Sequence, residues 1–315
     1  MGVRTGISWT DHTFSPWWGC TKISGACKHC YAETWAARWG YGWGPDGQRR
    51  FFSDKHWREP LAWNRAAAEA GVQRFVFCAS MADVWEGSEG IPTETWNQMQ
   101  AARARLYQLV QQTPWLVWLF LSKRPENAPE LCPREWFQGA WPSNVWAGAT
   151  MENQEETDRR WPALARLPAP RHFASYEPAM EAVDFSAALR GVEVARIATL
   201  PADYPASEPA TAHPERRRLD WIIVGGESGA KARTFDAEWA RSVIRQCRAA
   251  GASPFVKQLG ACAVDAVNGI AGRDTPVPAE VKLYRRLKDG HGADLAEWAP
   301  DLRVQERPAP LPVAA

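Results

Sequence analysis

The sequence predicts an α/β protein, a (β/α) barrel or partial TIM-type barrel made of a single domain. Short apolar runs alternate with helical patterns from residue 58 onward, which indicates parallel strands joined by right-handed crossovers. These runs are apolar throughout rather than alternating, as in strands covered on both faces. Six such runs, with a seventh strand expected near residues 5–15, favour a barrel over a short open sheet. A doubly wound sheet is the alternative fold.

Each element follows from its local pattern. The six apolar runs predict strands at residues 74–80, 115–122, 144–150, 171–177, 220–226 and 253–260. Helices are predicted at 58–71, 93–112, 153–167 and 236–251. The first of these helices ends at Gly71, and the second has Thr93 as its predicted N-cap.

Two segments depart from the alternating pattern. Residues 198–218 are rich in Pro, Ala and charge, which predicts a mobile insertion within the barrel. Residues 304–315, with the sequence "VQERPAPLPVAA", are predicted to form a disordered tail. We therefore expect one barrel domain over residues 1–303.

Composition and charge exclude several classes of protein. The net charge is +1, so a broad electrostatic footprint for nucleic acid is absent, although a local basic patch is compatible with this value. The start "MGVRTGISWT" lacks the apolar core of a signal peptide, and the apolar run "WLVWLFL" is too short to span a bilayer. Seven cysteines, an odd number without a secretory signal, predict reduced thiols in the cytoplasm and no membrane partner.

The stretch "WWGCTKISGACKHCYAE" places Cys20, Cys27 and Cys30 within eleven positions. A zinc site would need a fourth ligand, for which His12 and His29 are the neighbouring candidates. A disulfide is disfavoured by the predicted compartment. A four-iron (4Fe–4S) cluster fits the count better, because three thiolates leave one iron open to a substrate or cofactor.

The longer stretch "SPWWGCTKISGACKHCYAE" resembles the cluster motif of radical S-adenosylmethionine (SAM) enzymes, although the first gap has six residues here instead of three. The resemblance is closer to a family found largely in bacteriophages and prophages, named for its three-cysteine motif and described as radical-SAM-like. Similar blocks occur in the same order: "SMADVWEG", "LSKRPEN", "NVWAGATMENQEETDRRWPAL", "ASYEP", "WIIVGGESG" and "VKQLG".

The resemblance implies roles for individual residues. Cys20, Cys27 and Cys30 would hold the four-iron cluster, and SAM would bind its open iron. The remaining cofactor contacts implied by the motifs are Tyr31, Ser80, Asp83, Gly225 and Gly226. An external electron donor would be a further partner.

Polar residues follow each predicted strand, at the edge where parallel folds place their chemistry. Among them, Lys123, Glu177 and Glu227 are the candidate catalytic groups. We expect an enzyme that generates a 5′-deoxyadenosyl radical, and the phage setting of the family implies a nucleotide or nucleic-acid base as substrate. The alternative is a non-catalytic phage protein that binds nucleic acid and is stabilised by zinc or an iron–sulfur cluster. In that case Lys123 and Arg124 would contact the phosphates of the nucleic acid.

Overall fold

A seven-stranded parallel sheet forms the centre of the computed structural model, which describes residues 5–45, 49–194, 215–266, 282–284 and 287–313. Its strands, in spatial order, are β1 (His12–Phe14), β4 (Arg74–Cys78), β5 (Leu116–Ser122), β6 (Val145–Thr150), β7 (His172–Tyr176), β10 (Leu219–Gly225) and β12 (Ser253–Gln258). Every adjacent pair is parallel. All seven predicted strands are confirmed, and their spatial order follows the chain.

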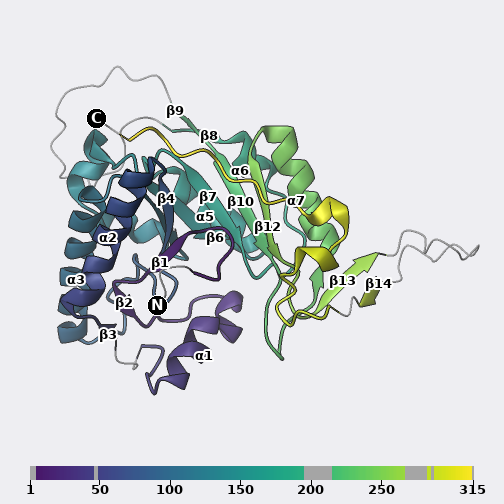
Figure 1. Ribbon diagram of the computed structural model, residues 1–315, viewed down its shortest axis with the longest axis horizontal. Coiled ribbons are helices and arrows are strands. Elements are labelled where there is room, and N and C mark those ends of the chain that lie inside the picture. Colours follow the sequence, from purple (N-terminus) through teal and green to yellow (C-terminus); the bar gives the residue numbers. More distant parts are fainter. Residues whose placement is uncertain (1–4, 46–48, 195–214, 267–281, 285–286, 314–315) are drawn as a thin grey trace, which may run out of the picture.

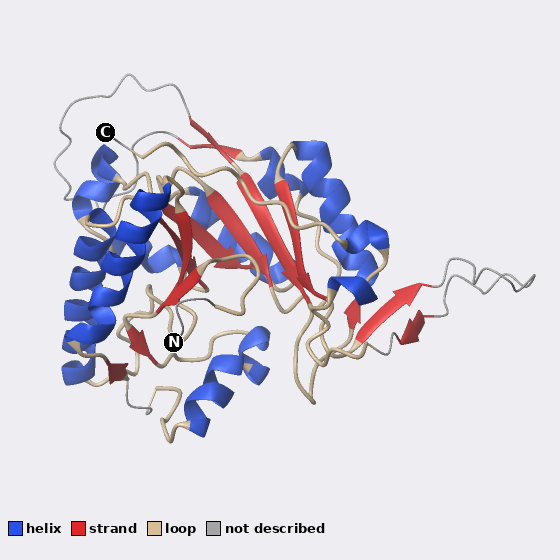
Figure 2. Ribbon diagram, viewed as in Figure 1, coloured by secondary structure: helices blue, strands red, loops and turns tan. Residues whose placement is uncertain are grey.

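Helices cover the outer face of this sheet (Figures 1 and 2). They are α2 (Asp54–Ala70), α3 (Thr93–Gln111), α5 (Gln154–Ala165), α6 (Ser186–Arg190) and α7 (Ala237–Ala250). The four predicted helices are thereby confirmed, with small shifts at their ends. Pro92, rather than Thr93, occupies the N-cap position of α3, and α2 starts at Asp54, with Ser53 in the N-cap position.

Aromatic side chains fill the inner face of the sheet. Trp9, Phe77, Phe173 and Trp221 belong to one buried cluster, with ring centroids of Trp9 and Phe77 4.6 Å apart. Gly148 makes room for this packing, because a Cβ there would lie 2.3 Å from the ring of Phe173. A sheet covered by helices outside and filled by aromatic rings inside is a partial barrel. The described residues contain no ladder that joins β1 to β12.

The C-terminal segment pairs with the edge strand β12, which corrects the prediction of a disordered tail from residue 304. Val256 N–H donates to Val304 O (2.8 Å), and Glu306 N–H donates to Pro254 O (3.0 Å). Arg307 then donates to Ser8 O near the opposite edge of the sheet. An unpaired edge offers free N–H and C=O groups, and residues 304–307 satisfy several of them.

Smaller elements surround the barrel. The two-stranded sheet of β8 (Val192–Val194) and β9 (Glu215–Arg217) is antiparallel, so residues 215–217 of the predicted mobile insertion form a strand. Residues 198–214 of that prediction lie outside the described residues. The other elements are β2 (Trp17–Trp18), β3 (Arg50–Phe51), α1 (Tyr31–Arg38), α4 (Ala128–Leu131), β11 (Phe235–Asp236), β13 (Ala263–Ala266) and β14 (Lys282–Tyr284), and the single-turn elements η1 (Gly25–His29), η2 (Pro125–Asn127), η3 (Trp136–Ala140), η4 (Leu295–Glu297) and η5 (Pro300–Leu302).

Candidate functional site

The three clustered cysteines lie between β2 and α1, in a segment that we call the cysteine loop (residues 19–31). Cys20 follows β2, Cys27 lies in η1, and Cys30 is the N-cap residue of α1. All three are free thiols of intermediate exposure. Figure 1 shows α1 below the sheet, apart from the outer helical layer. The loop contacts groups that follow β4, β5 and β10, and it therefore lies at the C-terminal ends of the strands.

Asp83 organises one side of this site. Its buried carboxylate accepts hydrogen bonds from Ser122 Oγ (2.6 Å), Lys123 N–H (3.0 Å), Arg124 Nη1 (3.0 Å) and Trp85 N–H (3.1 Å). Burial opposes ionisation of Asp83, but the charge of Arg124 and these hydrogen bonds lower the pKa of the carboxyl group below its usual value. Four donors saturate the carboxylate. Asp83 therefore positions the strand ends, and its contact with SAM stays a prediction.

Arg124 and Glu86 hold the start of the cysteine loop. Arg124 Nη1 lies 3.8 Å from Cys20 Sγ and Nη2 donates to Thr21 O (2.7 Å). Glu86 accepts from Thr21 N–H (2.7 Å) and from Arg49 Nη2 (2.9 Å). Arg49, Glu86 and Arg124 are all buried. Sequence reasoning did not single out Glu86, although it lies in the same "SMADVWEG" block as Asp83.

Glu227 holds the other end of the loop. It accepts from Arg233 Nε (3.0 Å) and Nη2 (2.8 Å), and His29 Nδ1 lies 3.2 Å from its Oε2. Arg233 also donates from Nη1 to Gly25 O (3.0 Å). Burial raises the pKa of Glu227, but the hydrogen bonds from Arg233 and His29 lower it below its usual value. The predicted catalytic Glu227 is thus adjacent to the cysteines, as a brace rather than a free acid or base.

Lys123 connects the loop to the end of β6. Its Nζ donates to Thr150 Oγ1 (3.3 Å). Burial opposes ionisation of Cys27, but the charge of Lys123 and hydrogen bonds from Ile23 and Ser24 lower the pKa of this thiol below the ordinary value. By contrast, burial and the carboxylates of Glu86 and Asp83 raise the pKa of Cys20. Of these two thiols, Cys27 therefore ionises at the lower pH.

The remaining predicted catalytic residue, Glu177, pairs with Lys257, whose Nζ lies 3.1 Å from Glu177 Oε1. The double glycine fits closely around this pair. A Cβ on Gly225 would lie 2.7 Å from Glu177 Oε1, and one on Gly226 would lie 2.3 Å from a backbone oxygen after β12. Gly226 N–H donates to Gln258 O (3.1 Å), so it is not a free donor for a ligand. The Glu177 carboxylate leaves no room for a Cβ at Gly225, and close backbone approach leaves none at Gly226.

Tyr31 and Ser80, both expected near the cofactor, contact each other. The Tyr31 hydroxyl donates to Ser80 O (2.5 Å), which ties the first residue of α1 to the turn after β4. The side chain of Tyr31 is otherwise largely exposed. The structure therefore brings the candidate residues to one end of the barrel, around a single loop.

Ligand geometry distinguishes a single metal ion from a cluster. No group of three or more His, Cys, Asp or Glu side chains within the described ranges is arranged to hold one ion. The two candidate fourth ligands for zinc are engaged elsewhere: His12 stacks on Trp63 (4.3 Å), and His29 contacts Glu227. The thiolates of a four-iron cluster each bind a different iron and need not converge on one point. The structure thus places three free thiols on one braced loop, and the group that they hold stays a prediction.

The fold and the site define a parallel α/β protein with a partial barrel and a three-cysteine loop at its strand ends. The chain belongs to a family described as "Protein of unknown function (DUF5131)", whose model matches residues 4–298. No curated protein and no solved structure matches it. Across the described residues, no helix has the length and apolarity needed to cross a membrane.

Proposed function

We propose that this chain is a radical-SAM-like iron–sulfur enzyme of the bacteriophage and prophage three-cysteine type, acting in the cytoplasm. The observation that carries the proposal is the position of Cys20, Cys27 and Cys30. They lie on one loop, braced at both ends by charged groups from the C-terminal strand ends. In parallel barrels this end is where substrates and cofactors bind.

Cys20, Cys27 and Cys30 would hold the four-iron cluster, and SAM would bind beside it. When bound, this pair would supply one-electron reductive cleavage and a 5′-deoxyadenosyl radical, with the electron coming from an external donor. The chain's own residues position the site. Lys123 favours the thiolate of Cys27, and Arg124 and Arg233 fix the loop backbone at Thr21 and Gly25.

Two of the three proposed catalytic residues are suited to contact a substrate. The Lys123 ammonium group makes one hydrogen bond to a described residue, Thr150, and Glu177 is paired with Lys257 at the strand ends. The aromatic interior beneath them excludes water from below, which protects a reactive radical from competing reactions. Glu227 serves as a brace in this proposal.

Anaerobic reconstitution with iron and sulfide tests the proposal. We expect about four irons per chain, as one such cluster requires, and formation of 5′-deoxyadenosine from SAM under reducing conditions. Cys20→Ala, Cys27→Ala or Cys30→Ala should abolish cluster binding. Cys262→Ala is the matched control, because Cys262 is also a free thiol of intermediate exposure. Stoichiometric zinc with no capacity for iron would refute the cluster.

A second candidate function, binding of nucleic acid, rests on helix α1. Tyr31, Trp35 and Trp39 are 55%, 44% and 62% exposed, and their spacing of four places them along one face of the helix. The Arg38 guanidinium lies 5.8 Å from the centroid of Trp35. Exposed aromatic rings beside a cation suit stacking on single-stranded bases, and the same surface adjoins the cysteine loop.

The aromatic face of α1 can be tested by fluorescence titration with a single-stranded oligonucleotide. Trp35→Ala combined with Trp39→Ala should weaken binding about tenfold or more, since stacking contributes about 1–3 kcal/mol per base. Leu295→Ala, which truncates an exposed apolar residue elsewhere, should leave binding unchanged. Equal affinity of the double variant and the intact protein would exclude this surface.

A further inference from the structure

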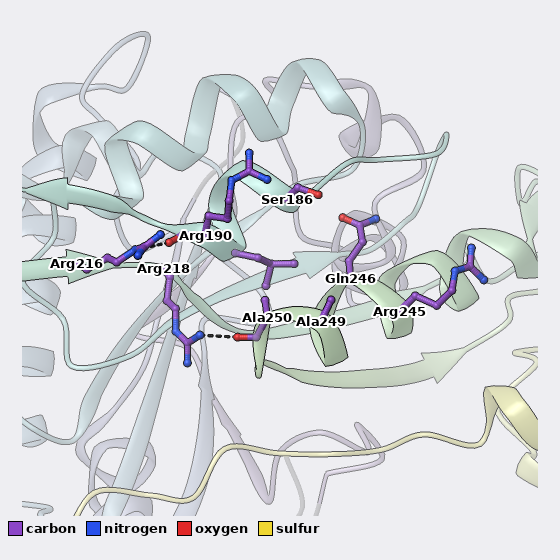
Figure 3. A pocket seen from close by; sticks show the side chains of 9 residues that line it. Ser186, Arg190, Arg216, Arg218, Arg245, Gln246, Ala249 and Ala250 are labelled. Atoms are coloured by element: carbon purple, nitrogen blue, oxygen red, sulfur yellow. Dashed lines mark hydrogen bonds between the residues drawn. The ribbon is translucent and has the colours of Figure 1, made fainter.

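A pocket rich in arginine lies on the outer layer, away from the cysteine loop (Figure 3). Its volume is about 720 Å³, and its lining includes Arg190 at the end of α6, Arg216 and Arg218 beside β9, and Arg245 on α7. Arg216 and Arg218 precede β10, whereas the cysteine loop contacts residues that follow this strand. The length of β10 separates the two places by about 20 Å, at about 3.3 Å per residue. The pocket is therefore distinct from the site described above.

The four arginines retain unused hydrogen-bond donors. Arg216 Nε donates to Arg190 O (2.6 Å), and Arg218 Nη1 donates to Ala250 O (2.6 Å); Figure 3 shows both bonds. Arg190 makes no side-chain hydrogen bond or ion pair with any described residue. Each guanidinium carries five N–H donors. Capping of the last carbonyls of α6 and α7 accounts for one donor on each of Arg216 and Arg218, and Glu238 accepts from Arg245 Nη2. Most donors of the four guanidinium groups have no acceptor among the described residues.

The lining contains no carboxylate, although acidic residues lie nearby. Glu238 pairs with Arg245 Nη2 (2.7 Å), and Asp184 is close enough for the charge of Arg190 to act on it. Glu193 stands opposite Arg216 in the β8–β9 ladder, yet within the described part of the chain it forms no ion pair with it. Arg216 and Arg218 have no carboxylate partner among the described residues. Positive charge therefore faces the pocket from both of its walls.

We propose that this pocket binds an oligophosphate ligand, of which a nucleoside triphosphate is the best fit. Planar guanidinium groups pair with phosphate through two parallel N–H···O bonds, and four of them can hold more than one phosphate group. The volume lies within the range of about 300–1,000 Å³ typical of small-molecule sites. Leu189, Ala249 and Ala250 provide an apolar wall for a base or sugar.

Isothermal titration with ATP, with inorganic tripolyphosphate and with a single-stranded oligonucleotide tests this inference. We expect saturable binding of the first two, weakened by added salt. Arg190→Gln combined with Arg245→Gln should weaken both about tenfold or more. This double variant leaves the two capping bonds in place, so the helix ends are preserved. Arg190→Gln alone, which removes no contact within the described residues, should weaken binding in the same direction.

The matched control is Arg58→Gln combined with Arg65→Gln, which removes two exposed arginines from α2 and the same amount of charge. Unchanged affinity in this control, with loss in the pocket variant, would establish the site. Absence of saturable binding by either phosphate ligand would refute the inference, as would equal loss in both variants. Binding of the oligonucleotide alone would also refute it. None of these measurements depends on the iron–sulfur cluster, so failure here leaves the proposed enzyme function untouched.

Discussion

Arg124 and Lys123 are neighbours in the chain, yet their side chains lie in different surroundings. The sequence suggested that both contact phosphate. In the structure, Arg124 is buried against Asp83 and the backbone of Thr21, whereas Lys123 reaches Thr150 and favours the thiolate of Cys27. The guanidinium can satisfy a carboxylate and a carbonyl together because its donors form a planar fork. Arg124 is therefore a structural residue of the loop.

Arg124→Gln should accordingly destabilise the protein. Removal of one partner from a buried ion pair leaves the carboxylate of Asp83 without its counter-charge, which costs about 3–5 kcal/mol. Denaturant unfolding measures this loss. Lys123→Gln is the control at the adjacent position and should cost less than about 1 kcal/mol, because it removes one long hydrogen bond. A small loss for Arg124→Gln would contradict the bracing role.

Strand β7 carries a buried histidine at its first position. His172 packs in the core, and its Nε2 lies 3.0 Å from Leu167 O, where the neutral ring donates a hydrogen bond. Burial lowers the pKa of His172 to about 4, below the ordinary value of about 6.5. The unfolded chain therefore takes up this proton before the folded chain does. The contribution of the neutral ring to stability is complete above about pH 6.5 and is lost as the pH falls toward 4.

The pH dependence of unfolding tests this behaviour of β7. Between pH 7 and pH 4 the intact protein should lose about 3 kcal/mol more than His172→Gln, following about 1.4 kcal/mol for each pH unit between the two pKa values. His291→Gln changes an exposed histidine and should leave the profile unchanged. Parallel profiles for the intact protein and His172→Gln would show that His172 does not titrate below its ordinary range.

At the scale of the whole molecule, the two edges of the partial barrel are connected by the C-terminal segment. Residues 304–306 pair with β12, and Arg307 contacts Ser8 ahead of β1. The Arg307 guanidinium also lies 5.8 Å from the ring centroids of Phe75 and Phe255. The segment thus covers an exposed strand edge and part of the aromatic interior. An uncovered edge would be a template for pairing with a second chain.

Deletion of residues 304–315 should therefore lower stability by about 1–3 kcal/mol, from the lost hydrogen bonds and the cation–π contacts. We also expect self-association through β12. Thermal unfolding and light scattering after size-exclusion chromatography measure the two effects. Deletion of residues 309–315 retains the contacts at 304–307 and is the control. A shortened protein that is monomeric and as stable as the intact chain would show that the edge needs no cover.

Seven strands, the main helices and the three-cysteine motif could be predicted from the amino-acid sequence. Apolar runs and helical periodicity are local signals, and strands β4, β5, β6, β7 and β10 are buried along almost their whole length, so local pattern and burial agree. Polar residues after each strand likewise indicated which end of the sheet carries the candidate site.

The contacts of those polar residues, by contrast, follow from the folded arrangement and could not be predicted from the sequence. The sequence predicted Asp83 as a cofactor contact and Glu227 as a catalytic group. In the structure, Arg124 pairs with Asp83 and Arg233 pairs with Glu227, and both carboxylates brace the cysteine loop. The sequence of residues 304–307 predicts a disordered tail, because a local pattern does not show that an unpaired strand edge lies beside these residues in the folded chain. The arginine pocket joins residues from α6, β9 and α7 that no motif links. Such roles arise from contacts between segments far apart in the chain, and a local pattern carries no information about them.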